Sequence, residues 1–221
     1  MKRTLVALLA LLGALGMAQR FSVEASAGYI YSGLGGQLAV VAEDLAPGLP
    51  LAVRLGLGFA TSDGLNDSFD LGGGGGPTWG SIKESEYGQN ITIALDALFN
   101  IPTQGLLPGQ GSSVAAYLGL RYNLFEGGGT DSGGDTYKAT ANAFGVGGGL
   151  RLAFPLDRTL TLVADAGLDY FFQGCITFSG TGVGTTITAC PGDSLYPDAN
   201  SFATQPDGFV FRARLGGAFR F

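Results

Sequence analysis

Apolar and polar side chains alternate along the C-terminal segment with a repeat of two residues. One face of this segment carries Phe209, Phe211, Ala213, Leu215, Gly217, Phe219 and Phe221. The other face carries Arg212, Arg214, Gly216 and Arg220. The repeat predicts a β-strand, because successive side chains of a strand point to opposite faces of the sheet. In a soluble sheet the apolar face meets a protein core, whereas in a membrane barrel it meets lipid. The segment by itself leaves both interpretations open.

The N-terminal segment favours the membrane interpretation. Two basic residues precede the apolar run 5–15, and Gly16-Met17-Ala18 supplies the small residues of a signal-peptidase site before Gln19. This pattern is typical of a secretory signal peptide, and the run is shorter than the roughly 20 apolar residues of a membrane-spanning helix. We therefore expect a signal peptide over 1–18 and one exported domain over 19–221. Glycine or charge interrupts every later candidate helix, and a membrane chain without spanning helices has to form a closed barrel.

Eight segments of the chain show the alternation, each close to the roughly 9 to 11 residues that a tilted strand needs to cross a bilayer. They cover residues 21–31, 37–44, 51–60, 90–101, 114–124, 140–154, 160–172 and 209–221. The short connections 46–50, 102–113 and 155–158 are predicted to be periplasmic turns, and the long ones are predicted to be extracellular loops, at 61–88, 126–138 and 173–207. The sequence therefore predicts an all-β fold, an eight-stranded antiparallel transmembrane β-barrel.

Aromatic residues gather at both ends of the predicted strands. Threading the chain from a periplasmic N-terminus places one group at the outer rim: Tyr29, Tyr31, Phe59, Tyr122, Phe144, Tyr170, Phe172, Phe209 and Phe211. A second group falls at the inner rim: Phe21, Phe99, Phe154, Phe219 and Phe221. Two aromatic rings at the membrane interfaces are typical of barrels embedded in lipid.

By this pattern, the chain after the signal peptide resembles the small outer-membrane barrels of the OmpA and OmpX type. The most specific motif is 214–221, in which Gly216, Phe219 and Phe221 are similar to the C-terminal signal that the barrel-assembly machinery reads. In its leader and its lack of histidine, the chain also resembles the small major outer-membrane barrel of Thermus. The resemblance implies a monomer in the cell outer membrane of a diderm bacterium, with outer-membrane lipids and the assembly machinery as partners.

Composition and charge exclude several functions. The formal net charge is -6, which makes nucleic acid an unfavourable partner. The chain has no histidine, so catalysis by Ser-His or Cys-His pairs and His-ligated metal sites are removed together. Barrels that add or remove acyl chains of lipid A are similar in size, but their known catalytic sets include histidine. We therefore expect no enzymatic activity, no catalytic residues and no required cofactor.

The inward faces of the predicted strands carry charges of both signs. The acids are Glu24, Glu43, Asp96, Asp165 and Asp169, and the arginines are Arg54, Arg121, Arg151, Arg212 and Arg214. One interpretation makes Asp165 and Asp169 an ion path or an acid–base pair. The other is a network of ion pairs that fills the lumen, because an eight-stranded barrel is only wide enough for side chains and unpaired buried charges are costly. We favour the network, with Arg212 and Arg214 bound to Glu24, Asp165 or Asp169.

The predicted outer loops hold the two cysteines and many acidic residues. Cys175 and Cys190 are the only cysteines of an exported chain, which predicts a disulfide. It would close a loop of about 15 residues and stabilise it by roughly 3 kcal/mol. A solvated acidic surface explains the carboxylates most simply. Weak candidates for Ca²⁺ ligands, which follow no EF-hand pattern, are Asp63, Asp67, Asp131 and Asp135.

These observations favour a non-enzymatic outer-membrane barrel that contributes to envelope integrity. Its acidic, disulfide-stapled loops would be presented to cell-surface or envelope partners. The alternative is a narrow channel or transporter for ions or small apolar molecules. A third possibility is a soluble carrier similar to lipocalins, in which the apolar residues would face inward around a ligand.

Overall fold

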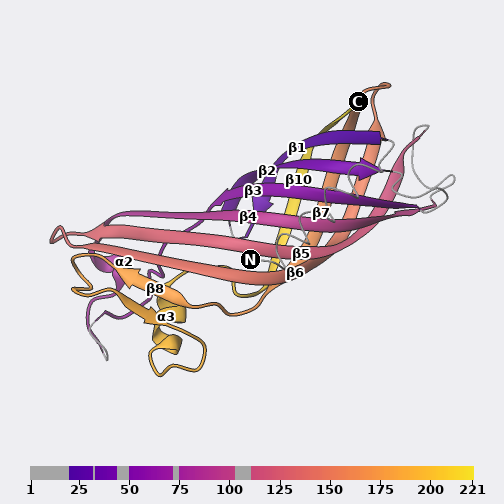
Figure 1. Ribbon diagram of the computed structural model, residues 1–221. Helices are drawn as coiled ribbons and strands as arrows, with labels where there is room; N and C mark the ends of the chain where they lie inside the picture. The colour runs from indigo at the N-terminus through magenta and orange to yellow at the C-terminus, as the bar shows by residue number, and fades with distance from the viewer. Residues whose placement is uncertain (1–19, 32, 44–49, 72–74, 103–110) are drawn as a thin grey trace.

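Eight strands form a closed antiparallel barrel in the computed structural model, which describes residues 20–31, 33–43, 50–71, 75–102 and 111–221 (Figure 1). They are β1 (Arg20–Ile30), β2 (Gly33–Glu43), β3 (Leu51–Thr61), β4 (Lys83–Ile101), β5 (Ser113–Asp131), β6 (Thr136–Pro155), β7 (Leu160–Phe171) and β10 (Gly208–Arg220). From β1 to β7 each strand pairs with the next, β7 pairs with β10, and β10 closes the barrel on β1. The predicted fold is confirmed. The predicted signal peptide lies outside the described residues.

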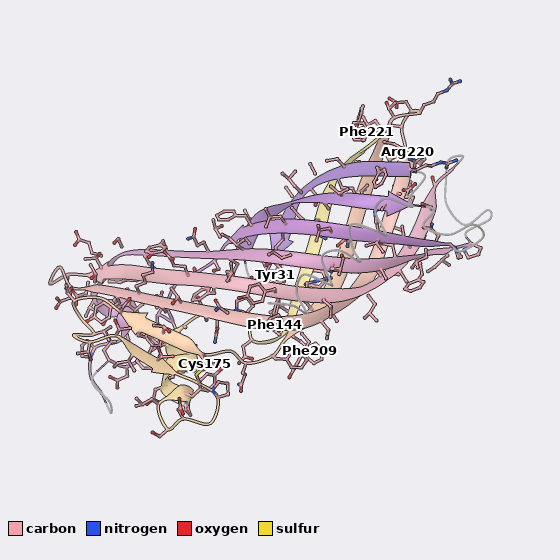
Figure 2. All side chains as sticks on the ribbon, viewed as in Figure 1. Tyr31, Phe144, Cys175, Phe209, Arg220 and Phe221 are labelled. Carbon is pink, nitrogen blue, oxygen red and sulfur yellow. A yellow bond between two sulfur atoms is a disulfide. The ribbon has the colours of Figure 1, made fainter. Side chains whose placement is uncertain are left out.

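The two faces of each strand have opposite polarity, with the apolar side chains outside. On β3, Leu55 and Leu57 are 38% and 57% exposed, whereas Arg54 between Val53 and Leu55 is 2% exposed. Figure 2 shows the labelled Phe144 and Phe209 together near one end of the barrel and Phe221 at the opposite end. A protein whose largest apolar side chains point outward needs an apolar surrounding, so this polarity rules out a soluble carrier with an inward apolar face.

The prediction that Tyr31 belongs to the outer aromatic ring is wrong. Its side chain is only 3% exposed, and its hydroxyl donates a hydrogen bond of 2.9 Å to Oδ2 of Asp169 in the lumen. The ring also packs edge-on against Phe171, with 5.2 Å between centroids. The strand β1 ends at Ile30, and Tyr31 has a φ of 50°. This left-handed conformation interrupts the alternation on which the prediction depends.

The strands β4, β5 and β6 are 19 or 20 residues long and continue well beyond the length that spans a bilayer. Residues 126–131 and 136–138, predicted to be loop, continue the β5–β6 pair up to the partners Thr130 and Thr136. Residues 83–88 likewise belong to β4. In β5 the prediction failed because Gly127, Gly128 and Gly129 carry no side chains and so show no alternation.

Beyond the barrel, the long connections fold into a compact unit instead of open loops. We call this unit the cap; it comprises residues 62–71, 75–89, 125–141 and 173–207. It contains α2 (Trp79–Ile82), β8 (Ile176–Ser179), β9 (Ile187–Ala189) and α3 (Tyr196–Phe202), and it projects from the end of the barrel away from the C-terminus (Figure 1). In the described part of the chain, no helix is long and apolar enough to cross a membrane.

The cap has a hydrophobic core of its own, and its sheet is continuous with the barrel. Its strand β8 pairs with the outer part of β6, and β9 adds to β8. Trp79, which is fully buried, contacts Tyr137 and Phe202 edge-on. Other buried members of this core are Leu65, Phe125, Ala139, Ala141, Ile176, Phe178, Ala189, Tyr196, Ala199 and Ala203.

Candidate functional site

Charged side chains fill the middle of the barrel. Among the described residues, nine charged side chains are at most 8% exposed, and they are the nine predicted for the lumen network: Glu24, Arg54, Asp96, Arg121, Arg151, Asp165, Asp169, Arg212 and Arg214. They come from seven of the eight barrel strands, all except β2. The alternation of β-strands aims them inward, because each occupies a position between two outward residues.

Asp96 lies between two arginines in this network. Arg54 and Asp96 are opposite each other in the β3–β4 register, and Arg54 donates from Nε at 3.0 Å and Nη2 at 2.8 Å to Oδ2 of Asp96. Arg121 donates from Nη1 at 2.6 Å to Oδ1 of Asp96 and from Nε at 3.0 Å to Oδ1 of Asp169. Charge-assisted bonds of this kind are about twice as strong as neutral ones.

Asp165 joins strands that are not neighbours. Its Oδ2 accepts a 2.8 Å bond from Nη1 of Arg54 across the lumen, and its Oδ1 accepts a 2.8 Å bond from Nη2 of Arg214. The hydroxyl of Tyr117 donates to the same Oδ1 at 3.2 Å. The aromatic ring of Tyr117 contacts two guanidinium groups, Arg54 at 4.8 Å and Arg212 at 5.1 Å from its centroid. One tyrosine therefore fixes the positions of several charges.

The remaining ion pairs lie toward the two ends of the network. Glu24 accepts a hydrogen bond from Nη2 of Arg151, and its other oxygen is 3.8 Å from Nη1 of Arg54. Arg212 is 3.3 Å from Oδ1 of Asp169. The structure thus places Arg212 beside Asp169 and Arg214 beside Asp165.

Glu43 does not join the network, although its position predicted an inward charge. It lies at the end of β2, 3.8 Å from Arg220, and the two side chains are 24% and 41% exposed. Arg220 is at the C-terminal end of β10, at the rim of the barrel, and solvent reaches both side chains of this ion pair.

The space left around the network is small. Two cavities of about 10 Å³ each lie beside Gln37 and Arg214. A larger cavity of about 140 Å³ lies at the end of the barrel that carries the C-terminus, lined by residues that include Glu43, Arg151 and Arg220. Both oxygens of Asp96 and both oxygens of Asp165 already accept hydrogen bonds from guanidinium groups. The network is therefore suited to filling and bracing the barrel.

Two comparisons found no match: no protein-family model fits the sequence, and no curated protein matches it. Among solved structures, the crystal structure of a major outer membrane protein from Thermus thermophilus is 51% identical, with a TM-score of 0.81. The match covers 91% of this chain and 99% of that chain. The chain belongs to the family of this Thermus outer membrane protein. Its resemblance to outer-membrane barrels is thereby confirmed.

Two further solved structures match at low identity. Ail, the attachment invasion locus protein of Yersinia pestis, is 14% identical over 91% of this chain and 97% of that chain, with a TM-score of 0.45. CarO of Acinetobacter baumannii is 17% identical over 90% of this chain and 97% of that chain, with a TM-score of 0.38.

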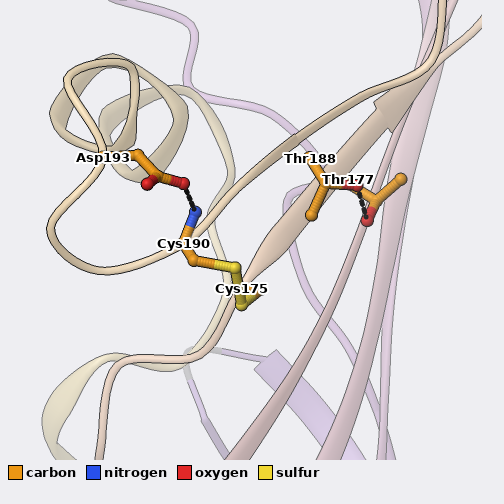
Figure 3. The surroundings of a disulfide bond; sticks show 5 residues. All are labelled: Cys175, Thr177, Thr188, Cys190 and Asp193. Carbon is orange, nitrogen blue, oxygen red and sulfur yellow. Dashed lines mark hydrogen bonds between the residues drawn. A yellow bond between two sulfur atoms is a disulfide. The ribbon is translucent and has the colours of Figure 1, made fainter.

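The predicted disulfide is confirmed in the cap. Cys175 and Cys190 are bonded and link the residue before β8 to the residue after β9 (Figure 3). The hydroxyl groups of Thr177 and Thr188 share a 3.0 Å hydrogen bond across the same pair of strands. The N–H of Cys190 donates to Oδ2 of Asp193 at 2.8 Å. The bond therefore closes a short hairpin whose ends are already held together.

The four candidate calcium ligands do not converge. Asp67 is 2.5 Å from Nζ of Lys83, and Oδ1 of Asp131 accepts the backbone N–H groups of Gly133 and Asp135 at 2.9 Å. No group of three or more histidine, cysteine, aspartate or glutamate side chains within the described ranges is placed to hold a metal ion. Hydrogen bonds to Asp67 and Glu86 raise the pKa of Lys83, so this lysine stays charged at neutral pH. Calcium binding stays a prediction.

The residues of the proposed assembly signal lie at the end of β10. Gly216 is opposite Ser26 of β1, and a Cβ at this position would collide with the backbone of Ala25 and Ser26. The rings of Phe219 and Phe221 are 48% and 77% exposed and contact each other at 5.1 Å. Close packing against β1 therefore explains why residue 216 is glycine. The role of Phe219 and Phe221 in assembly stays a prediction.

The core of the cap is the feature that the sequence interpretation missed. A signal for it was present, because the segment assigned to the first long loop includes Leu65, Phe69, Leu71 and the single tryptophan, Trp79. In the last loop, Ile176 and Phe178 alternate with threonine and serine. Large apolar residues in an exported loop have to be buried against something.

Proposed function

We propose that this protein is a non-enzymatic barrel of the outer membrane whose lumen does not conduct. In this proposal it contributes to the integrity of the envelope and presents a rigid cap at the cell surface. The observation that carries the proposal is the lumen network, in which nine buried charges bridge seven strands, and the two cavities beside Gln37 and Arg214 measure only about 10 Å³ each.

The lumen network favours a bracing role over transport. A conducting pore needs a continuous path of water, whereas the bond between Arg54 and Asp165 crosses the lumen at 2.8 Å. Opening such a path would leave buried charges unpaired, which costs about 3 to 5 kcal/mol for each broken pair. The pairing of β10 with β1 leaves no free barrel edge, which supports a monomer surrounded by outer-membrane lipids.

The cap supports the second part of the proposal. Its hydrophobic core, its disulfide and its continuity with β6 hold it in one orientation relative to the barrel. A rigid surface loses little entropy when it binds a partner. We infer that contacts with cell-surface or envelope partners are made by the cap and that the lumen takes no part in them.

The absence of histidine and the pairing of the buried carboxylates support a non-enzymatic role. Asp96 and Asp165 each bind two arginines and have no unpaired oxygen for acid–base work. The 51% identical relative is a major outer membrane protein of Thermus thermophilus. A barrel whose lumen is filled by paired charges is suited to a structural role in the envelope.

Planar-bilayer recording of the purified full chain tests the lumen. We expect no sustained current at neutral pH. As a matched comparison, the double variant Arg54→Ala/Asp165→Ala, which removes the pair that crosses the lumen, should pass current more often than the wild type. Stable, reproducible conductance of the wild type would replace the proposal with a narrow channel.

Complementation of a deletion strain tests the role in the envelope. The deletion should increase uptake of a dye that an intact outer membrane excludes, and the full chain should restore exclusion. A variant with residues 174–206 replaced by a short turn separates the two roles, because it keeps the barrel strands. Restored exclusion by this variant would assign integrity to the barrel, and unchanged dye uptake in the deletion strain would refute the envelope role.

A further inference from the structure

The buried charges of the lumen do not balance. Among the described residues, the buried network has five arginines but four carboxylates. Arginine cannot lose its proton in a protein, so the excess positive charge cannot be relieved by deprotonation. A buried charge without a counter-charge is costly, because the solvation that it loses is not replaced.

The excess positive charge of the lumen is greatest near Arg212. This side chain is 1% exposed, and its closest carboxylate, Oδ1 of Asp169 at 3.3 Å, also accepts a hydrogen bond from Arg121. The other oxygen of Asp169 accepts from Tyr31. Nε of Arg212 has no hydrogen-bond acceptor in the protein, and Nη2, the atom 3.3 Å from Oδ1 of Asp169, makes an ion pair there without a hydrogen bond.

Two neighbouring side chains also have donors without acceptors. They are Nε2 of Gln37 and Nε of Arg214, on residues that are 7% and 5% exposed. Gln37, Arg212 and Arg214 line one cavity of about 10 Å³, whose remaining walls are Ile30, Tyr31, Gly58, Thr92 and Ala94. The hydroxyl of Thr92 already donates to Asn123. Three side chains with unpaired donors therefore line the cavity, and none of its lining residues carries a carboxylate.

We propose that this cavity binds one small monovalent anion of the halide class, with chloride as the natural occupant. An anion accepts hydrogen bonds from several N–H groups at once and neutralises the excess charge. A water molecule fits the volume but brings no charge, so it would leave the excess positive charge of the lumen without a counter-charge. Phosphate, sulfate and carboxylate-bearing molecules are too large for a cavity that holds about one water molecule.

Crystals of the full chain grown with bromide in place of chloride test the site directly. Bromide scatters anomalously and has nearly the size and charge of chloride. We expect an anomalous peak within hydrogen-bond distance of Arg212 and Gln37. A lumen with ordered side chains and no anomalous peak would show that the cavity holds water only, and this result would overturn the proposal.

Thermal unfolding measures the same site in solution. At constant ionic strength, the unfolding midpoint of the wild type should rise with the logarithm of chloride concentration when chloride replaces gluconate, because a ligand of the folded state stabilises it. The variant Arg212→Gln should lose most of this chloride-dependent shift.

Arg220→Gln is the matched control, since it removes the same charge at the solvated rim and should retain the shift. If Arg212→Gln does not fold, Gln37→Leu replaces it and should also lose most of the shift. The same midpoint in chloride and gluconate for the wild type, or an equal shift in the lumen variant and the rim control, would refute the site. The inference is independent of the cap, so its failure would leave the proposed surface role unchanged.

Discussion

Replacing Asp165 with asparagine removes one charge from the centre of the network while keeping the side-chain shape. Asp165 is bonded to Arg54 and Arg214, each at 2.8 Å, and all three side chains are at most 4% exposed. The Coulomb attraction within each of these two ion pairs is about 4 kcal/mol at an effective dielectric constant near 20. Neutralising Asp165 also relieves its own desolvation penalty of several kcal/mol. The expected net loss is therefore about 3 to 5 kcal/mol, the range seen when one partner of a buried pair is removed.

The assay is reversible urea unfolding in lipid vesicles, followed by the circular dichroism of the barrel. Glu43→Gln is the matched control, because it makes the same chemical change in the solvated pair with Arg220 and should cost about 0 to 1 kcal/mol. The double variant Asp165→Asn/Arg214→Gln should lose less stability than the two single variants added together, since the two residues share a bond. Equal, small losses for Asp165→Asn and Glu43→Gln would refute the claim that the network braces the barrel.

The other predictions use the same preparations. Leu55→Arg, on the lipid face midway along β3, should cost about 2 to 4 kcal/mol in the vesicle assay, whereas Phe209→Arg at the rim should cost about 0 to 1 kcal/mol; equal costs would mean that the lipid face is misassigned. Reducing the Cys175–Cys190 bond should lower the stability of the cap by about 3 kcal/mol without unfolding the barrel. Faster protease cleavage within 173–207 would report this loss, and unchanged cleavage would contradict it. Deleting Phe221 should reduce insertion in cells far more than stability after refolding, because its ring is 77% exposed. A parallel fall in both quantities would show that the residue acts through stability.

The alternation of side chains predicted the strands because it is a local property, and the export signal was needed to interpret them as a membrane barrel. Leu55 and Arg54 are neighbours in the chain, and in any strand they must point to opposite faces. The same rule predicted ten inward charges, of which nine lie in the lumen and Glu43 lies at the rim. The disulfide followed from cysteine count and export, since two cysteines allow a single pairing within the chain.

The local pattern failed where side chains were absent or the backbone departed from a strand. Gly127 to Gly129 continue β5 without leaving any sign of alternation, so the predicted strand ends too early. Tyr31 follows the last residue of β1 and has a left-handed backbone conformation. Its position in the alternation therefore no longer predicts which face its side chain points to. Residues 127–129 are held by their pairing with β6, and Tyr31 is held by its hydrogen bond to Asp169, and the sequence displays neither contact.

What the sequence determined by itself is which residues face inward and which face lipid, because that choice depends only on position along a strand. Tertiary structure alone decided which side chains meet. Arg54 reaches Asp165 on a strand that is not its neighbour, and the excess charge at Arg212 is visible only once the shared oxygens of Asp169 are counted. The same holds for the cap: Trp79 and Phe202 are far apart in the chain, and both are buried by a contact between two different loops.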